Sequence, residues 1–232
     1  MKKWISRFWL CGIVAFALTP ATSAPSNYRT CSIKNNRRSQ YTALTTYPIY
    51  RDKGVVTRLA NFQLAHLART EHSAFLKEAR QIIRNGWKLG GLEHTLRFEA
   101  TDFQGPGLIS VSYNKIQYLA GAHGMNWTLC FNFGKANGRA RRLTLGDFFK
   151  NDKEYQKRVS QVAIQKLRQK GAAWVIDGTV KSLTVEQLNR FTVHKDGLRF
   201  YFDPYEMGPY AAGSYDVKLT LKELGAGFHA PL

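Results

Sequence analysis

The sequence has little negative charge for its size. Its 232 residues include 34 Lys and Arg but only 16 Asp and Glu, which gives a formal charge of +18. A chain this basic is attracted to polyanions such as nucleic acid, anionic lipid or cell-wall polymers. Hydrophobic residues make up 44% of the chain, so disorder is excluded as a description of the whole. The length allows one or two domains with a real core.

The chain also lacks an apolar run of the roughly 20 residues that a membrane span needs. Its apolar run covers only residues 8–18, follows Lys2, Lys3 and Arg7, and leads into small residues before Ala24. This order is typical of a secretory signal peptide. We therefore expect a signal peptide at residues 1–23, no transmembrane segment, no lipid anchor, and a periplasmic or secreted protein of charge +15 once those three basic residues are removed. Export disfavours nucleic acid and favours a cell-wall glycan or another envelope polyanion as the partner.

Cysteine is scarce as well. Only Cys31 and Cys130 remain after the expected cleavage. An even pair in an oxidising compartment predicts one disulfide, with two separate buried thiols as the alternative. Neither cysteine has another cysteine or clustered histidines nearby, so we expect no metal site and no cofactor.

Catalytic motifs are missing. The sequence contains no Gly-x-Ser-x-Gly elbow and no His-Glu-x-x-His, and its six histidines are scattered. His94 falls on the apolar face of an expected strand, which is typical of a core residue. A non-enzymatic protein is therefore favoured. An enzyme acting on wall glycan, with His123 near Asp203 or Glu206, stays open as an alternative.

Hydrophobic periodicity predicts the secondary structure. We expect helices over 55–84 and 153–170 and a short capped helix over 184–189; strands are expected over 92–100, 108–119, 127–133, 191–193, 198–202 and 217–221. The excess of strands and the hairpin signal at Asn137-Gly138 indicate an α+β fold, mainly an antiparallel sheet with packed amphipathic helices. Residues 24–40 are expected to form a tether or a first irregular strand. The rest divides into halves at 41–119 and 120–232, which form either two units or one.

Two segments are candidates for ligand binding. The small-residue turn over 118–124 carries His123, and the loop over 202–213 carries Tyr205, Glu206 and Tyr210. Prolines fix such a loop, and tyrosines offer flat faces with hydroxyl groups that suit sugar stacking or a protein interface. The structural alternatives are a turn histidine bonded to nearby backbone and an internal latch of tyrosines packed on the sheet.

Basic residues are clustered in two places. Arg139, Arg141 and Arg142 lie at the expected hairpin, and the expected helix over 153–170 carries Lys157, Arg158, Lys166, Arg168 and Lys170. We expect these residues to attract an anionic ligand, although such faces are also common as solvated surface.

Short motifs in a fixed order resemble the RsiV-type extracytoplasmic domain. They occur at 118–124, 131–133, 143–149, 197–202, 204–206 and 209–213, and the resemblance covers roughly residues 41–224. That domain occurs in a lysozyme-sensing anti-sigma factor and in the non-catalytic region of a peptidoglycan deacetylase. Neither a membrane helix nor a matching catalytic domain is found here, so the resemblance implies an isolated sensing or binding unit, with 120–232 as its RsiV-type half.

The sequence thus favours an exported, non-enzymatic protein that binds an anionic cell-envelope component, with peptidoglycan as the best candidate. A lysozyme-binding receptor or inhibitor-like module is the alternative that the resemblance implies. Typical lysozymes are themselves basic, however, and two strongly positive proteins repel each other at long range.

Overall fold

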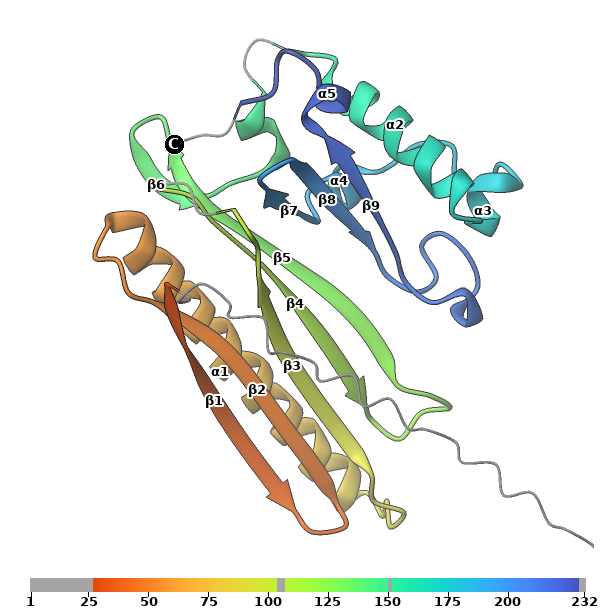
Figure 1. Ribbon diagram of the computed structural model, residues 1–232. Helices are drawn as coiled ribbons and strands as arrows, with labels where there is room; N and C mark the ends of the chain where they lie inside the picture. Colours follow the sequence, from red (N-terminus) through yellow and green to blue (C-terminus); the bar gives the residue numbers. More distant parts are fainter. Residues whose placement is uncertain (1–26, 104–106, 150–151, 230–232) are drawn as a thin grey trace, which may run out of the picture.

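The chain folds into two β-sheets with helices packed on them (Figure 1). The computed structural model describes residues 27–103, 107–149 and 152–229, so the expected signal peptide lies outside the described residues. One sheet has six strands in the order β1-β2-β3-β4-β5-β6, and the other has three in the order β7-β8-β9. The predicted α+β class is confirmed.

The large sheet comprises β1 (Tyr28–Arg37), β2 (Tyr41–Tyr50), β3 (Leu92–Ala100), β4 (Ile109–Tyr118), β5 (Met125–Ala136) and β6 (Arg139–Arg142). The small sheet comprises β7 (Phe191–His194), β8 (Gly197–Phe202) and β9 (Tyr215–Thr220). The helices are α1 (Val55–Arg84), α2 (Tyr155–Gln169), α3 (Ala173–Ile176), α4 (Val185–Leu188) and α5 (Leu221–Leu224), with 3₁₀ turns η1 (Leu145–Phe148) and η2 (Tyr210–Ala212).

The large sheet is mixed rather than purely antiparallel. Strands β2 and β3 pair in parallel, and α1 forms the crossover between them. The other neighbouring strands of this sheet pair antiparallel. The prediction of a mainly antiparallel sheet therefore holds, but hydrophobic periodicity gave no sign of the parallel pair because it does not encode strand direction.

Helix α1 packs along one face of the large sheet (Figure 1). Its 30 residues match the predicted helix at both ends. Small and apolar residues at helical spacing, such as Ala60, Leu64 and Ala68, are fully buried and face the strands. They meet Leu96, Val111, Tyr113 and Phe133 from the sheet, so the core of this layer lies between one helix and the central strands.

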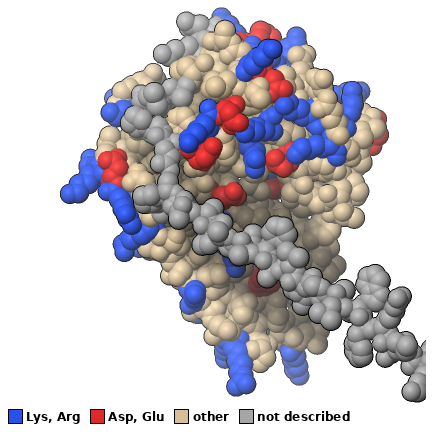
Figure 2. All heavy atoms as spheres, in the orientation of Figure 1, with Lys and Arg blue, Asp and Glu red and all other residues tan. Residues whose placement is uncertain are grey.

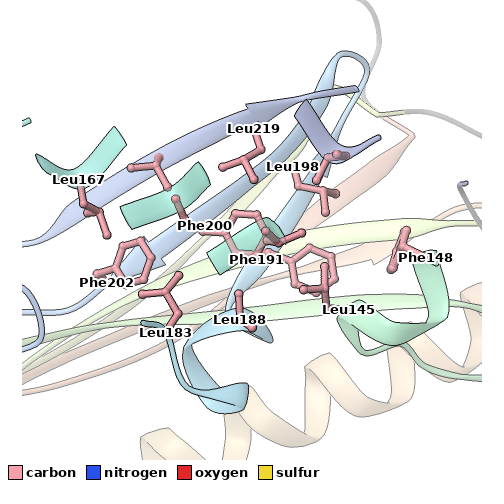
Figure 3. Close-up of a cluster of buried hydrophobic side chains, with 14 of the residues drawn as sticks. Leu145, Phe148, Leu167, Leu183, Leu188, Phe191, Leu198, Phe200, Phe202 and Leu219 are labelled. Atoms are coloured by element: carbon pink, nitrogen blue, oxygen red, sulfur yellow. The ribbon is translucent and has the colours of Figure 1, made fainter. Parts of the chain in front are cut away.

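The second layer has its own core between the small sheet and α2. Figure 3 shows Phe191, Phe200 and Phe202 of the sheet gathered with Leu145, Leu167 and Leu188 from the surrounding helices. The predicted capping box at the start of α4 is confirmed, because Thr184 accepts the N–H of Gln187 while the Gln187 side chain accepts the N–H of Thr184.

Buried hydrogen bonds join the two sheets at the edge strand β7. Ser110 Oγ on β4 accepts the N–H of Val193 at 2.8 Å, and Asn132 Nδ2 on β5 donates to the Phe191 carbonyl at 3.0 Å. The Ser110 hydroxyl donates in turn to Asn132 Oδ1 at 2.6 Å. These side chains satisfy backbone groups that a strand edge otherwise leaves unpaired. The small sheet is therefore fixed in position on the large one.

Two expectations about the organisation of the chain left alternatives open, a tether or a first strand over 24–40 and two units or one beyond it. Residues 28–37, within the expected tether, form the regular strand β1 and pair with β2 over ten residues. The expected division at residue 120 falls in the turn between β4 and β5, and the same sheet continues on both sides of it. The strand β1 corresponds to the first strand that the sequence left open beside a tether, and its hydrogen-bonded pairing with β2 compensates for its lack of apolar alternation.

The predicted disulfide between Cys31 and Cys130 is wrong, because both cysteines are free. Cys31 lies on β1 and Cys130 lies on β5. These two strands are four strand-to-strand spacings apart in the large sheet. At about 4.8 Å per spacing the two are separated by roughly 19 Å, whereas a disulfide needs Cα atoms within about 7 Å. The alternative of two separate thiols is the one that the structure shows.

Candidate functional site

The structure brings together three of the predicted binding residues. The rings of His123 and Tyr210 stack with centroids 3.9 Å apart and an interplanar angle of 25°. The Tyr205 ring lies 5.5 Å from that of Tyr210. His123 comes from the turn between β4 and β5, whereas both tyrosines come from the loop between β8 and β9. We call these three residues the aromatic cluster.

A backbone contact fixes the aromatic cluster in place. The Tyr210 hydroxyl donates to the carbonyl of Gly124 at 2.7 Å, and a ring nitrogen of His123 lies 2.9 Å from the same oxygen. Tyr210 therefore acts partly as the internal latch that the sequence left open. Tyr205 is different, because 49% of its surface is exposed. The cluster thus consists of an anchored pair and one tyrosine that is available to a ligand.

The backbone of Tyr205 is strained. Its φ of 69° lies in the left-handed region, which costs a residue other than glycine about 1–2 kcal/mol. Strain of this kind persists only where surrounding contacts impose it, and it is found most often at functional sites. The backbone conformation at this position disfavours tyrosine, and the side chain is exposed rather than part of the core. The presence of tyrosine here is therefore explained by the aromatic side chain itself.

Arg190 and two carboxylates hold the start of the loop. Arg190 contacts both oxygens of Glu206, at 2.5 and 3.2 Å, and lies 3.1 Å from Asp203 Oδ2. Asp203 Oδ1 accepts the N–H of Thr128 on β5 at 2.8 Å. Burial raises the pKa of the Asp203 carboxyl above its ordinary value, although Arg190 acts in the opposite direction. Glu206 is therefore a positioning residue in the structure, with its carboxylate already occupied.

The sequence did not identify the partners in this arrangement. Arg190 and Thr128 are separated from the loop in sequence and carry no motif. The only available signal was that loop residues Asp203 and Glu206 are acidic and three apart, which gives no indication of a cation on another element. The enzyme alternative places His123 near Asp203 or Glu206. In the structure both carboxylates contact Arg190, and the ring of His123 contacts Tyr210 and the carbonyl of Gly124.

The predicted arginine cluster is only partly free. Arg141 forms an ion pair with Asp147, and Arg142 donates to the carbonyl of Cys130 at 2.8 Å. Asp147 also accepts the N–H and hydroxyl of Thr144, so it caps the η1 turn. Among the described residues, Arg139 alone of the three has neither an ion pair nor a side-chain hydrogen bond.

The structure does not bring these arginines to the aromatic cluster. His123 precedes β5 and Arg139 follows it, so they lie at opposite ends of a twelve-residue strand. At about 3.3 Å per residue, this strand is roughly 40 Å long. One small ligand therefore does not contact both sets.

Three of the basic residues on and just after α2 form ion pairs within their own layer, whereas Lys157 and Arg168 form none among the described residues. The ion pairs are Arg158–Asp152, Lys166–Glu223 and Lys170–Asp216. Figure 2 shows Lys and Arg interspersed with Asp and Glu over the upper part of the molecule, where the small sheet and α2 lie. The expectation that this helix offers an unpaired basic face is therefore only partly supported by its contacts.

A cavity of about 490 Å³ lies apart from the aromatic cluster. It is found at the start of α1 and at the β3–β4 turn, with Tyr28, Tyr50, Asp52 and Lys135 among the residues that line it. Because β4 runs from this end to the turn that carries His123, about 30 Å separates the two places. The cavity shares no lining residue with the aromatic cluster.

The described residues show neither a metal-binding cluster nor a membrane-spanning helix. They contain no group of three or more His, Cys, Asp and Glu side chains arranged to hold a metal ion. No helix within the same residues is long and apolar enough to cross a membrane.

Comparison with known proteins gives one family match and one curated relative. Residues 146–222 match the family model DUF3298, described as a protein of unknown function. The chain is 24% identical over 190 residues to peptidoglycan-N-acetylmuramic acid deacetylase PdaC of Bacillus subtilis strain 168. That match covers 77% of this chain but only 38% of the deacetylase.

Two solved structures share the fold. A DUF3298 family member from Bacteroides fragilis NCTC 9343 has a TM-score of 0.59 at 17% identity and covers 88% of this chain and 94% of its own. A DUF3298 family protein from Pseudomonas aeruginosa PAO1 has a TM-score of 0.62 at 16% identity and covers 89% and 96%. The narrower resemblance to the RsiV-type domain stays a prediction. Residues 146–222 thus carry a DUF3298 segment, within a fold that those two structures share.

Proposed function

We propose that this chain is an exported, non-enzymatic protein that binds cell-wall glycan through the aromatic cluster. The observation that carries the proposal is the exposed, strained Tyr205 beside the stacked pair His123 and Tyr210. Flat aromatic faces with polar edges suit sugar rings, which present an apolar face and hydroxyl groups. The similarity to a protein named as a peptidoglycan deacetylase supports peptidoglycan as the glycan.

The surroundings of the cluster suit a binding site better than a reactive one. Arg190 binds both Asp203 and Glu206 beneath the loop, and these ion pairs hold the loop in place. A ring that is already held in place loses little freedom when a ligand binds, which improves affinity. The overall positive charge of the chain attracts the anionic wall at long range, so the cluster has to supply only the short-range contact.

Retention on purified wall sacculi across a salt series tests the proposal. We expect the protein to sediment with the sacculi, and Tyr205→Asn to reduce retention several-fold at every salt concentration. Asparagine tolerates a positive φ and removes the ring, so the loop backbone is preserved. Phe62→Gln, which removes an exposed aromatic ring from α1, is the matched control and should leave retention unchanged. Equal retention of wild type and Tyr205→Asn would contradict the proposal.

A further inference from the structure

The charge of the chain is concentrated in the layer formed by the large sheet and α1. Residues 27–142 contain 18 Lys and Arg against six Asp and Glu, whereas residues 143–232 contain 13 against 10. The second layer therefore nearly balances its own charge, and most of the excess belongs to the first. Many of these basic residues lie on α1.

The outer face of α1 carries one continuous basic stripe. The exposed residues Val55, Arg58, Phe62, His66, Arg69, Ser73, Lys77, Arg80 and Arg84 follow one another at intervals of three or four residues. At 3.6 residues per turn they fall within an arc of about 100° on the side away from the sheet. We call these nine residues the α1 stripe.

No acidic residue interrupts the α1 stripe. Glu71 points toward the sheet, where it pairs with Lys115 at 2.7 Å. Glu78 follows Lys77 directly and so lies about 100° further round the helix. The five Lys and Arg side chains of the stripe form no ion pair within the described part of the chain. Five cations therefore face solvent without compensation.

The α1 stripe is straight and long. From Arg58 to Arg84 it spans 26 residues of one unbroken helix, or about 39 Å at 1.5 Å per residue. Because α1 is the outermost element on its side of the large sheet, the stripe is the line along which a flat surface touches this layer (Figure 1). A flat anionic surface thus contacts all five cations at once.

Two apolar side chains lie within the same stripe. Phe62 is 71% exposed and Val55 is 45% exposed, and both belong to the half of α1 nearer its N-terminus. The Phe62 ring stacks with His66, with centroids 6.3 Å apart. Isolated exposed apolar residues are common, but an aromatic ring among cations is the combination that anchors peripheral proteins at a lipid headgroup boundary.

We propose that the α1 stripe is a docking surface for an anionic phospholipid bilayer. Basic residues near such a surface each contribute about 1 kcal/mol, and Phe62 and Val55 enter the boundary between headgroups and acyl chains. A hydrated phosphate polymer offers the same charge but no apolar boundary to receive these side chains. Because the loop that carries Tyr205 and Tyr210 belongs to the other layer, docking through α1 leaves the aromatic cluster free for a second ligand.

Flotation with lipid vesicles tests the proposal directly. The purified protein should float with vesicles of phosphatidylglycerol mixed with phosphatidylcholine and remain behind with phosphatidylcholine alone. The triple variant Arg69→Gln, Lys77→Gln, Arg80→Gln should bind about tenfold or more weakly. The matched control, Lys153→Gln, Lys157→Gln, Lys181→Gln, removes the same charge from exposed positions of the second layer and should lose far less.

Two further variants separate this proposal from its competitors. Phe62→Gln should weaken vesicle binding severalfold and leave wall retention unchanged, whereas Tyr205→Asn should do the reverse. Equal losses for the two triple variants would overturn the proposal, because binding would then follow net charge alone. If Phe62→Gln binds vesicles normally and soluble polyphosphate displaces the wild type, the stripe is a phosphate-polymer site and the bilayer assignment is wrong.

Discussion

Tyr205 and Tyr210 are alike in sequence but have different roles in the structure. Tyr210 is held by its hydroxyl contact with Gly124 and by the ring of His123, whereas Tyr205 is exposed on a strained backbone. The sequence predicted both as ligand contacts, with an internal latch as the alternative. The latch description suits Tyr210, whereas ligand contact by Tyr205 stays a proposal, because a loop composition rich in Pro and Tyr does not indicate which ring faces inward.

Replacing Tyr205 should separate binding from stability. Tyr205→Asn relieves part of the cost of a positive φ, so we expect the free energy of unfolding to change by less than about 1 kcal/mol. Tyr205→Phe keeps the ring and should retain most of the wall binding that Tyr205→Asn loses. Chemical denaturation of the three proteins checks the first expectation. A loss of several kcal/mol would show that Tyr205 is part of the core instead.

His94 should make the protein sensitive to mild acid. Its ring is buried against Phe75, neither nitrogen has a hydrogen-bond partner, and burial, with smaller effects from Lys115 and His72, lowers its pKa to about 4. The unfolded chain binds a proton at this histidine below about pH 6.5, which the folded chain resists until about pH 4. The contribution of neutral His94 to the free energy of unfolding is therefore fully present above pH 6.5, and it is lost as the pH decreases from 6.5 to 4.

Urea denaturation at pH 7.5 and pH 5 measures this effect. We expect the wild type to lose about 1–2 kcal/mol more than His94→Leu does between the two pH values. His66→Gln, at an exposed position on α1, should show the pH dependence of the wild type. If His94→Leu and the wild type lose stability in parallel, His94 titrates normally in the folded protein.

The two cysteines should behave as independent thiols. Burial raises the pKa of the Cys130 thiol, and its side chain is almost inaccessible, so it should react far more slowly than the half-buried Cys31. Alkylation of the folded protein followed by mass spectrometry should show Cys31 modified first, and both modified after denaturation without reductant. Two cysteines that resist alkylation until reduced would restore the disulfide.

At the scale of elements, the sequence predicts most helices and strands but not how they associate. Helix α1 matches the prediction because its apolar spacing extends over 30 residues and ends at Asn85-Gly86. Strand β1 was left open beside a tether and the parallel pairing of β2 with β3 was missed, because both depend on backbone hydrogen bonds that no side-chain period records. The hydrogen bonds that join β7 to Ser110 and Asn132 were missed for a related reason. Isolated polar residues in a strand resemble solvent-facing positions in the sequence.

The hydrogen bonds of Ser110 and Asn132 should be important for stability. Asn132→Leu removes the donor to the Phe191 carbonyl and the acceptor for Ser110, and leaves buried polar groups unpaired. We expect a cost of about 2–3 kcal/mol in the free energy of unfolding. Asn126→Leu, which removes only the acceptor of a solvent-exposed hydrogen bond from Asn114 on the same sheet, is the control. Equal losses for both variants in thermal denaturation would mean that these bonds contribute little.

At the scale of the whole molecule, the charge that dominates the sequence is unevenly distributed. The layer of α2 and the small sheet pairs about half of its basic residues with its own acids, whereas the α1 stripe leaves all five of its cations unpaired among the described residues. The sequence predicted the attraction to polyanions but assigned it to 153–170 and 139–142. The unpaired basic face of α1 was not identified. Periodicity shows that this helix has a polar face, but only the fold shows whether acidic side chains lie close enough to pair with its basic residues.

The aromatic cluster and the α1 stripe share no residue and lie at different places on the molecule. The aromatic cluster joins the β4–β5 turn to the loop before β9, and the α1 stripe lies on the helix that covers one face of the large sheet. If both proposals hold, the molecule would bind a glycan at the aromatic cluster while the α1 stripe contacts a charged surface. Wall binding and vesicle binding should accordingly be lost through different substitutions.

Calorimetric titration with soluble peptidoglycan fragments tests the central claim most directly. For the wild type we predict saturable binding that weakens about tenfold in Tyr205→Asn, which corresponds to about 1.4 kcal/mol for the loss of one stacked ring. Phe62→Gln should bind as tightly as the wild type. Absence of binding by the wild type, or the same dissociation constant for the wild type and Tyr205→Asn, would contradict the account.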